Sequence, residues 1–294
     1  MNVVVTGACG FIGGHLVKAI VREHPDWNII CIDDYSSGAP TRHSSVGNVL
    51  YVNASTEQIE EVCGGFVNVV FHLGEYSRIV PSFIDVERCF RSNGWGTFNV
   101  INFCAKHGAK LVYAASSSKF GNNGEDENLS PYAWTKAKNI ELIRNYAKWF
   151  RLKAAITYFF NVYGPEHIRK GNYATVIGIF EQCVIDGEPL SVVAPGTQTR
   201  DFTHVDDIVA GLLLAAEKGT VEHDYLLGSG KEHTILEIAS AFNHPHKIWP
   251  ERRGERLSGQ AMTGAALTHL GWEAKHDVME YIASWKAEYD AAHV

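Results

Sequence analysis

Tyr132 and Lys136 lie four residues apart in the segment YAWTK, residues 132–136. On a helix this spacing places both side chains on one face, about 6 Å apart along the axis. A neighbouring ammonium group favours the ionised form of a tyrosine, which is then a usable general base. The same spacing is also typical of a surface pair on an amphipathic helix. The pair is therefore a candidate catalytic base with its partner.

Three consecutive serines precede this pair in the segment AASSSKFG, residues 114–121. They follow an apolar run that is typical of a strand, and strand C-termini of an open α/β sheet face the ligand crevice. One of these serines is predicted to hydrogen-bond the substrate hydroxyl that the tyrosine deprotonates. A loop or a helix cap is the structural alternative.

Gly7, Gly10 and Gly13 follow the strand-like run VVVT and begin a helical pattern. In such a turn the first glycine permits a tight bend, the second lets a pyrophosphate approach the backbone, and the third lets helix and strand pack closely. A plain βα turn is the alternative. A second strand-like run ends at Asp33, about 20 residues on, where a carboxylate holds the ribose hydroxyls of a dinucleotide. Asp33 and Asp34 would repel a 2′-phosphate, so the pattern favours NAD over NADP.

The elements that must position these residues alternate along the chain. Helical patterns separate several of the β-rich runs, and a long helix is predicted over 132–150, so the sequence predicts βαβ units around a parallel sheet. Capping boxes at Thr234 with Glu237 and at Asp277 with Glu280 indicate later helices. We predict a Rossmann-type α/β domain over 1–165, with a later contribution near 197–218, and a smaller substrate-binding lobe over 166–294. The predicted strands are 3–6, 29–33, 50–53, 67–73, 110–115 and 154–160.

Composition limits the possible partners and compartment. The net charge of −7 argues against binding to nucleic acid or an anionic membrane, and no apolar run is long enough to cross a bilayer. The N-terminus lacks the basic region of a signal peptide. The six cysteines form no CxxC pair, so we expect reduced core thiols in a cytoplasmic protein without a bound metal.

Several segments, taken in order, resemble the extended short-chain dehydrogenase/reductase family, in particular its NAD-dependent nucleotide-sugar 4-epimerases and dehydratases. GTQTRDFTHVDD is the most specific match to the family's GxQxRDFxHVDD. The other segments are TGACGFIG, CIDDYSSG, FHLGEYSRIVPS, NGWGT, FFNVYGP, and ERRGE followed by LGW.

The resemblance implies a role for each matching position. Ser116, Tyr132 and Lys136 would be catalytic, and Lys136 would also bind the nicotinamide ribose. Asn161, Arg200 and Arg252 fall where the family contacts the diphosphate, with Arg253 as an alternative to Arg252 and a salt bridge to Asp201 or Asp206 as the alternative for Arg200. His72 and His204 are interpreted as structural. Substrate contacts are also assigned to Ser82 and Ser117. Cofactor contacts are assigned to Gly7, Gly10, Phe11, Ile12, Gly13, Asp33, Asp34, Asn53, Leu73, Gly74, Tyr132 and Lys136.

The resemblance also bears on the reaction. The family's 4,6-dehydratases carry Asp and Glu directly after the catalytic Thr, where this chain has Ser117 and Ser118. Elimination is therefore disfavoured, and the expected reaction is epimerisation at C4 through a transient 4-keto sugar. A dehydratase, a one-way reductase or dehydrogenase, and a non-catalytic NAD sensor stay as alternatives. Glu75 is either a spare acid/base or a solvated loop charge.

The substrate and the oligomeric state are less defined. The nucleotide and the sugar are left open, with base contacts expected from the loops around 173–195. The family commonly dimerises through two helices, which in this chain correspond to residues near 94–107 and 132–150. Trp134, Ile140 and Trp149 are candidates for a homodimer contact, and internal packing is the alternative.

Overall fold

The computed structural model describes residues 1–120, 127–251, 258–259 and 261–293 of the chain. A seven-stranded sheet forms its centre, in the order β11-β6-β5-β4-β1-β2-β3, and every adjacent pair is parallel. The inner strand β1 is apolar and buried almost throughout, as expected for a sheet covered on both faces. The predicted Rossmann-type fold is confirmed, and the predicted strand limits differ from the observed ones by at most two residues. The strands are β1 (Asn2–Thr6), β2 (Asn28–Asp33), β3 (Asn48–Asn53), β4 (Val69–His72), β5 (Lys110–Ser116), β6 (Ala154–Phe159) and β11 (Asp224–Leu227).

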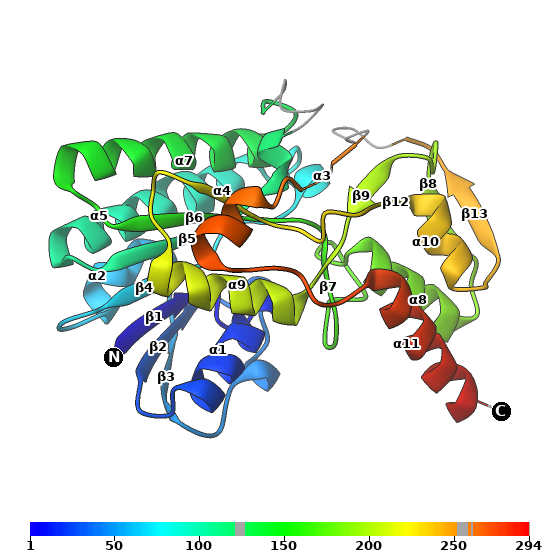
Figure 1. The fold of residues 1–294 in the computed structure, drawn as a ribbon, viewed down its shortest axis with the longest axis horizontal. Helices are drawn as coiled ribbons and strands as arrows, with labels where there is room; N and C mark the ends of the chain where they lie inside the picture. Colours follow the sequence, from blue (N-terminus) through cyan, green and yellow to red (C-terminus); the bar gives the residue numbers. More distant parts are fainter. Residues whose placement is uncertain (121–126, 252–257, 260, 294) are drawn as a thin grey trace.

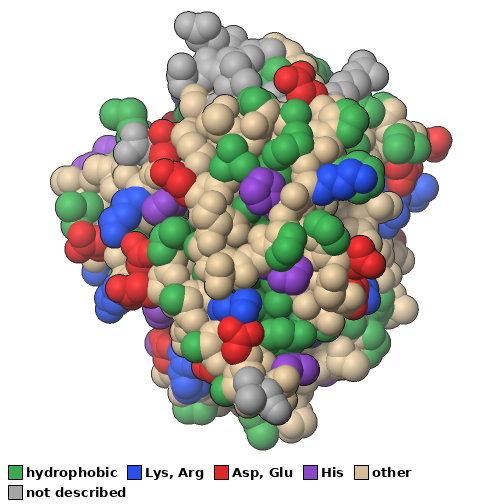
Figure 2. All heavy atoms as spheres, turned by 90° about the vertical axis from the view of Figure 1, so that its right-hand side faces the viewer, with side chains coloured by type: hydrophobic (Ala, Val, Ile, Leu, Met, Phe, Trp, Pro, Cys, Tyr) green, Lys and Arg blue, Asp and Glu red, His purple; other side chains and the backbone are tan. Residues whose placement is uncertain are grey.

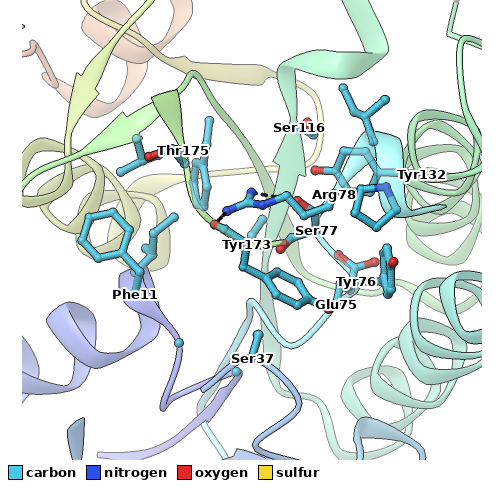
Figure 3. A pocket seen from close by; sticks show the side chains of 18 of the residues that line it. Phe11, Ser37, Glu75, Tyr76, Ser77, Arg78, Ser116, Tyr132, Tyr173 and Thr175 are labelled. Atoms are coloured by element: carbon cyan, nitrogen blue, oxygen red, sulfur yellow. Dashed lines mark hydrogen bonds between the residues drawn. The ribbon is translucent and has the colours of Figure 1, made fainter. Parts of the chain in front are cut away.

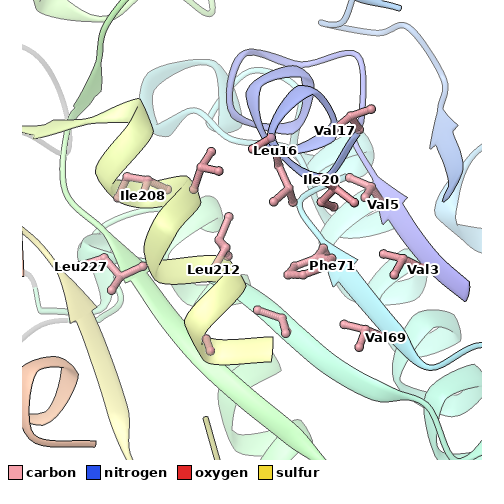
Figure 4. Close-up of a cluster of buried hydrophobic side chains, with 14 of the residues drawn as sticks. Val3, Val5, Leu16, Val17, Ile20, Val69, Phe71, Ile208, Leu212 and Leu227 are labelled. Atoms are coloured by element: carbon pink, nitrogen blue, oxygen red, sulfur yellow. The ribbon is translucent and has the colours of Figure 1, made fainter. Parts of the chain in front are cut away.

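Helices cover both faces of this sheet (Figure 1). On one face, α1 (Phe11–Glu23) and α9 (Val205–Lys218) lie side by side, and apolar side chains such as Leu16 and Leu212 fill the space between them and the sheet (Figure 4). On the other face lie α5 (Thr97–His107) and α7 (Pro131–Phe150), with α2 (Ile59–Val62) beside α5. The sheet order reverses between β1 and β4, which places the ligand crevice of such a fold at the C-terminal ends of these strands.

A smaller lobe follows the sixth strand and has a hydrophobic core of its own, formed by α8, β8, α10 and α11. The chain leaves this lobe to form α9 and β11, and β11 pairs with β6 at the edge of the main sheet. Helix α9 lies within the 197–218 range in which the sequence analysis placed a later strand or helix contribution, and β11 follows that range. The lobe elements are β7 (Val162–Tyr163), α8 (Val176–Asp186), β8 (Leu190–Val193), β9 (Thr199–Asp201), β10 (Thr203–His204), β12 (Glu232–Thr234), α10 (Ile235–Ala241), β13 (His246–Trp249) and α11 (Val278–Ala292).

The helix starts follow from local sequence. Ser130 caps α7 by accepting a hydrogen bond from the Ala133 amide, and Pro131 occupies the first turn, where its missing N–H costs nothing. Thr234 and Glu237 form the predicted capping box of α10, and Asp277 caps α11 through the Met279 amide. The remaining short elements are η1 (Pro40–Arg42), η2 (Thr56–Gln58), α3 (Ile79–Ser82), α4 (Val86–Cys89), the π-helix η3 (Phe90–Gly96), η4 (Ser117–Phe120) and η5 (Ala266–Leu270).

The helices proposed for dimerisation give a mixed result. Trp134 and Trp149 on α7 are 38% and 61% exposed, and Trp134 stacks on Phe90 of η3. Ile140 is 1% exposed and packs in the core beneath α7, so its assignment to a dimer contact is wrong. Ile140 is on the inner face of α7, and this face packs against the sheet. Dimerisation stays a prediction.

The visible face of the C-terminal lobe carries acidic and basic side chains interspersed with apolar and uncharged ones (Figure 2). In the described part of the chain, no helix combines the length with the apolar composition that a bilayer crossing requires.

Candidate active site

A cavity of about 720 Å³ lies at the C-terminal ends of the central strands, lined by residues from the sheet domain and from the lobe. One end, which we call the glycine end, is formed by Gly7, Gly10, Gly13 and Asp33. The other, the tyrosine end, is formed by Ser116, Tyr132, Arg78 and Tyr173 (Figure 3). The predicted catalytic residues and all of the predicted cofactor residues except Asn53 thus line one continuous cavity.

Backbone geometry forms the glycine end. Gly7 has φ +68°, a conformation that favours glycine. A Cβ on Gly13 would lie 2.0 Å from the Gly7 carbonyl oxygen, so the third glycine is required for α1 to pack against the turn. Helix α1 starts after Gly10 without a side-chain cap. The Gly10 amide donates to the Gly7 carbonyl oxygen at 3.1 Å, and the amides of residues 11–13 that follow it in the first turn are the ones that can bind an anionic ligand.

Asp33 ends β2 and is buried at the glycine end. Its carboxylate accepts hydrogen bonds from the amides of Cys9 and Tyr35, both at 2.8 Å, which hold it beside the glycine turn. Burial raises the pKa of this carboxyl above its usual value, and the two amide bonds oppose that shift. Each carboxylate oxygen keeps a further lone pair for a ribose hydroxyl. Asp34 is exposed and also lines the cavity.

Other predicted cofactor contacts divide into two groups. Phe11, Ile12, Leu73 and Gly74 line the cavity as predicted. Asn53 does not: its side chain is exposed at the end of the edge strand β3, and the cavity is lined instead by the following residues 54–57. The assignment of Asn53 to the adenine is therefore not supported by its position.

Helix α7 presents the YAWTK pair to the cavity. Tyr132 is 8% exposed and Lys136 is 5% exposed, and both line the wall together with Ser116 and Ser117 at the end of β5. The Lys136 ammonium donates to the Ala114 carbonyl oxygen at 2.6 Å and forms a hydrogen-bonded ion pair with Glu75. Two of its three N–H groups thus have partners among the described residues. The pair lies inside the molecule, not on a surface.

Glu75 is not the solvated loop charge that the sequence allowed. Its side chain is 1% exposed, because the loop after β4 turns it beneath the cavity wall. Oε1 accepts hydrogen bonds from Thr97, Tyr113 and Asn139 at 2.8, 3.1 and 2.9 Å, and Oε2 is paired with Lys136. With every oxygen engaged, the carboxylate holds Lys136 in place and compensates its charge.

A buried histidine extends this network. His72, at the end of β4, is fully buried between the hydroxyls of Thr6 and Thr97, and Thr97 donates in turn to Glu75. Burial lowers the pKa of His72 to about 4. A histidine that is neutral and bonded on both ring nitrogens is structural, as predicted.

Ser82 has a structural position rather than a substrate contact. It is fully buried, donates to the Ile79 carbonyl oxygen at 2.6 Å and accepts from the Tyr132 amide at 3.3 Å. It is not one of the residues lining the cavity. Its hydroxyl therefore joins α3 to the first turn of α7, which corrects the assignment to the sugar. Burial of this hydroxyl was not visible in the sequence.

The predicted phosphate contacts come from the lobe side. Asn161 has φ +25° and donates to the Asp201 carbonyl oxygen at 2.8 Å, while Arg200 on β9 is 9% exposed and donates to the Thr199 carbonyl oxygen at 2.7 Å. Both line the cavity. The Asp201 carboxylate instead accepts from Ser229 and from the amides of Gly230 and Ala261. Arg252 and its alternative Arg253 lie outside the described residues.

Of two further residues at the tyrosine end, Arg78 was missed by the sequence analysis, and Tyr173 was included only within the 173–195 range expected to contact the base. Arg78 and Tyr173 line the cavity, and the Arg78 guanidinium lies over the Tyr173 ring, 5.7 Å from its centroid. An arginine in FHLGEYSRIVPS, a segment that follows a central strand, was the signal available for the first. Tyr173 lies in a loop with no pattern, and only the tertiary structure places it.

His204 lies away from the cavity, at the start of α9. Its Nδ1 accepts the Asp206 amide at 3.2 Å, and its ring stacks on His276. One ligand atom from each of His204, Asp206 and His276 lies within 4.8 Å of the others. The helix cap and the ring stacking give His204 a structural role, as predicted.

Comparisons with known proteins agree with this arrangement. The model of the NAD dependent epimerase/dehydratase family matches residues 3–228. A UDP-N-acetyl-alpha-D-glucosaminuronate decarboxylase of Bacillus cytotoxicus is 30% identical over 80% of this chain and 77% of its own. A trifunctional UDP-glucose 4,6-dehydratase, 3,5-epimerase and reductase of Arabidopsis thaliana is 24% identical over 85% of this chain, which spans 40% of that protein's length. The crystal structure of a UDP-glucose 4-epimerase of Thermotoga maritima with UDP-glucose has a TM-score of 0.89, with 25% identity and full coverage of both chains.

Proposed function

Because the chain belongs to the NAD-dependent epimerase/dehydratase family, we propose that it epimerises a nucleotide-diphosphate sugar at C4, with NAD as its cofactor. One observation carries the choice of reaction. Beside the Tyr132 and Lys136 pair, the positions that would carry a carboxyl acid for elimination are Ser117 and Ser118, and the neighbouring Glu75 is fully engaged.

The glycine end fits the cofactor. Gly7, Gly10 and Gly13 leave the backbone bare where a pyrophosphate would approach, and the uncapped start of α1 supplies amides for its oxygens. Asp33 would accept the adenosine ribose hydroxyls, and the neighbouring Asp34 disfavours a 2′-phosphate. When bound, NAD supplies a hydride acceptor that later returns the hydride.

The chain's own residues transfer the proton of the C4 hydroxyl and orient the sugar nucleotide. Tyr132, as the phenolate, takes the proton of the C4 hydroxyl, and Ser116 hydrogen-bonds the same oxygen. Lys136, held by Glu75 and the Ala114 carbonyl oxygen, stabilises the phenolate through its positive charge. Asn161 and Arg200 hold the diphosphate while the 4-keto sugar turns over. Tyr132 then returns the proton to the oxygen on the reduced carbon.

The engagement of Glu75 weighs against an elimination. A dehydratase needs a carboxyl group that is free to protonate the leaving hydroxyl. The four partners of Glu75 leave no oxygen without a donor, and the carboxylate would first have to gain a proton to act as an acid, which would remove its charge from the ion pair with Lys136. We therefore propose that Glu75 is a positioning residue for Lys136.

An NMR assay tests the proposed function. Purified protein is incubated with catalytic NAD⁺ and a panel of UDP-, TDP-, GDP- and CDP-linked hexoses and hexuronates. We expect one sugar to convert to its C4 epimer with no net NADH. Accumulation of NADH would indicate a dehydrogenase, and a 4-keto-6-deoxy product a dehydratase. If NAD binds and no nucleotide sugar binds or reacts, the chain is a sensor.

A further inference from the structure

Arg78 lies in the middle of the tyrosine end, directly before α3, between Tyr173 and Tyr132 (Figure 3). Its guanidinium donates to the Ser77 carbonyl oxygen at 3.0 Å and to the carbonyl oxygen of Tyr173. The loop after β4 and the segment before α8 thus both fix its place. Neither acceptor carries a charge.

The guanidinium is left with unused donors and without a counterion. Two of its five N–H groups have these carbonyl partners, and Nε is buried with no partner among the described residues. None of the ion pairs in the described part of the chain includes Arg78. Burial lowers the pKa of Arg78, and the nearby Tyr132 and Tyr173 side chains oppose this shift.

Burying a cation of this kind costs free energy unless an anion pairs with it. Arg78 lines the cavity, so an anion can reach its guanidinium from that side, while the carbonyl oxygens of Ser77 and Tyr173 accept two of its N–H groups. Arginine also presents a planar fork that binds two oxygens of one anion, which a lysine or an amide does not. The environment of Arg78 therefore indicates that the ligand carries an anionic group next to this guanidinium.

We propose that Arg78 binds a carboxylate on the sugar ring, so that the preferred substrate is a nucleotide-linked uronate or a similarly acidic sugar. Arg78 and Tyr132 line the same end of the cavity (Figure 3), which is where the proposed function puts the reacting carbon, while Asn161 and Arg200, proposed for the diphosphate, line the cavity from the lobe side. This inference rests on the proposed function only in taking the ligand to be a nucleotide sugar. It does not depend on which reaction follows.

Binding to the NAD-saturated Tyr132→Phe protein, which should not turn over, tests the proposal by calorimetry. The probes are the uronate and the neutral hexose of one nucleotide, such as UDP-glucuronate and UDP-glucose, with matching pairs in the thymidine and guanosine series and the nucleoside diphosphates alone. In at least one series we expect the uronate to bind about tenfold more tightly or better than the neutral sugar. Arg78→Gln should remove that preference and Arg78→Lys should retain part of it.

Arg88→Gln is the matched control. Arg88 lines the same wall and lies 3.8 Å from the Asp85 carboxylate, so its removal should leave the preference unchanged. An equal loss of affinity for uronate, neutral sugar and free diphosphate in Arg78→Gln would assign Arg78 to the diphosphate and overturn the proposal. The absence of a uronate preference in every series would also overturn it. A uronate preference without epimerisation in the wild type would instead contradict only the proposed function.

Discussion

The two ends of the cavity differ in what forms their walls. At the glycine end, backbone atoms determine the shape: an added Cβ would lie 2.0 Å from the Gly7 oxygen at Gly13, and 2.8 Å from the Leu73 and Gly74 backbone at Gly7. At the tyrosine end, side chains from four separate segments converge. This difference predicts that the glycine end determines cofactor binding and that the tyrosine end determines substrate choice. Substitutions at the two ends should therefore have separable effects.

Gly13→Ala is expected to have the largest effect on NAD binding and to act only through the glycine end. The new Cβ would lie 2.0 Å from the Gly7 oxygen, whereas at Gly10 it would lie 3.2 Å away. We expect Gly13→Ala to lower NAD affinity by about 100-fold or more, equivalent to about 3 kcal/mol, and Gly10→Ala to lower it less. Calorimetric titration with NAD measures both.

Gly64→Ala, where a Cβ meets nothing within 4 Å, controls for the substitution itself. Circular dichroism separates a folded protein that has lost NAD from one that has not folded. Unchanged NAD affinity in a folded Gly13→Ala protein would show that the glycine end does not hold the cofactor.

Tyr132→Phe tests the tyrosine end without touching the glycine end. Loss of the general base should lower turnover by about 10²- to 10⁴-fold, while NAD affinity stays near that of the wild type. Tyr146→Phe on the same helix is the control, because Tyr146 is also buried but does not line the cavity. Near-normal turnover of Tyr132→Phe would remove the catalytic assignment.

Glu75→Gln tests the support beneath the tyrosine end. The substitution leaves the buried Lys136 ammonium without its counterion, so we expect the free energy of unfolding to fall by about 3 kcal/mol and turnover to fall as well. Glu60→Gln breaks an exposed pair with Lys106 and should cost less than about 1 kcal/mol. Urea denaturation measures both. If stability stayed intact and turnover fell only in a reaction that expels a leaving group, Glu75 would instead be identified as an acid.

His72 gives the most specific effect, a dependence of stability on pH. In the unfolded chain a histidine binds a proton near its usual pKa of 6.5, whereas burial lowers the pKa of folded His72 to about 4. As the pH falls from 6.5 to 4, the unfolded state binds the extra proton, so the free energy of unfolding falls by up to about 3 kcal/mol.

Denaturation midpoints at pH 7, 5.5 and 4.5 should therefore fall more steeply in the wild type than in His72→Gln. His246→Gln, at an exposed position of β13, is the control and should keep the wild-type slope. Equal slopes in all three proteins would contradict the assignment of a buried neutral histidine.

Sequence by itself determined the fold and the glycine end. The alternation of apolar runs and helical patterns predicted the parallel sheet, and Gly7, Gly13 and Asp33 lie where their spacing predicted. These features are local: a turn, a strand end and a helix start are encoded within a few residues of one another. The YAWTK spacing was likewise enough to place Tyr132 and Lys136 on one face of α7, although it did not show that this face is buried.

Only the tertiary structure decided the rest, because burial and partners depend on segments that are distant in the sequence. It brought Glu75 to Lys136, turned Ser82 into a link between two helices, left Asn53 exposed on an edge strand and buried Ile140. It also set Arg78 against Tyr173, 95 residues away, and left its charge facing the cavity. A charged side chain becomes informative about a ligand when packing removes water and supplies no counterion, and no short segment of sequence records that condition.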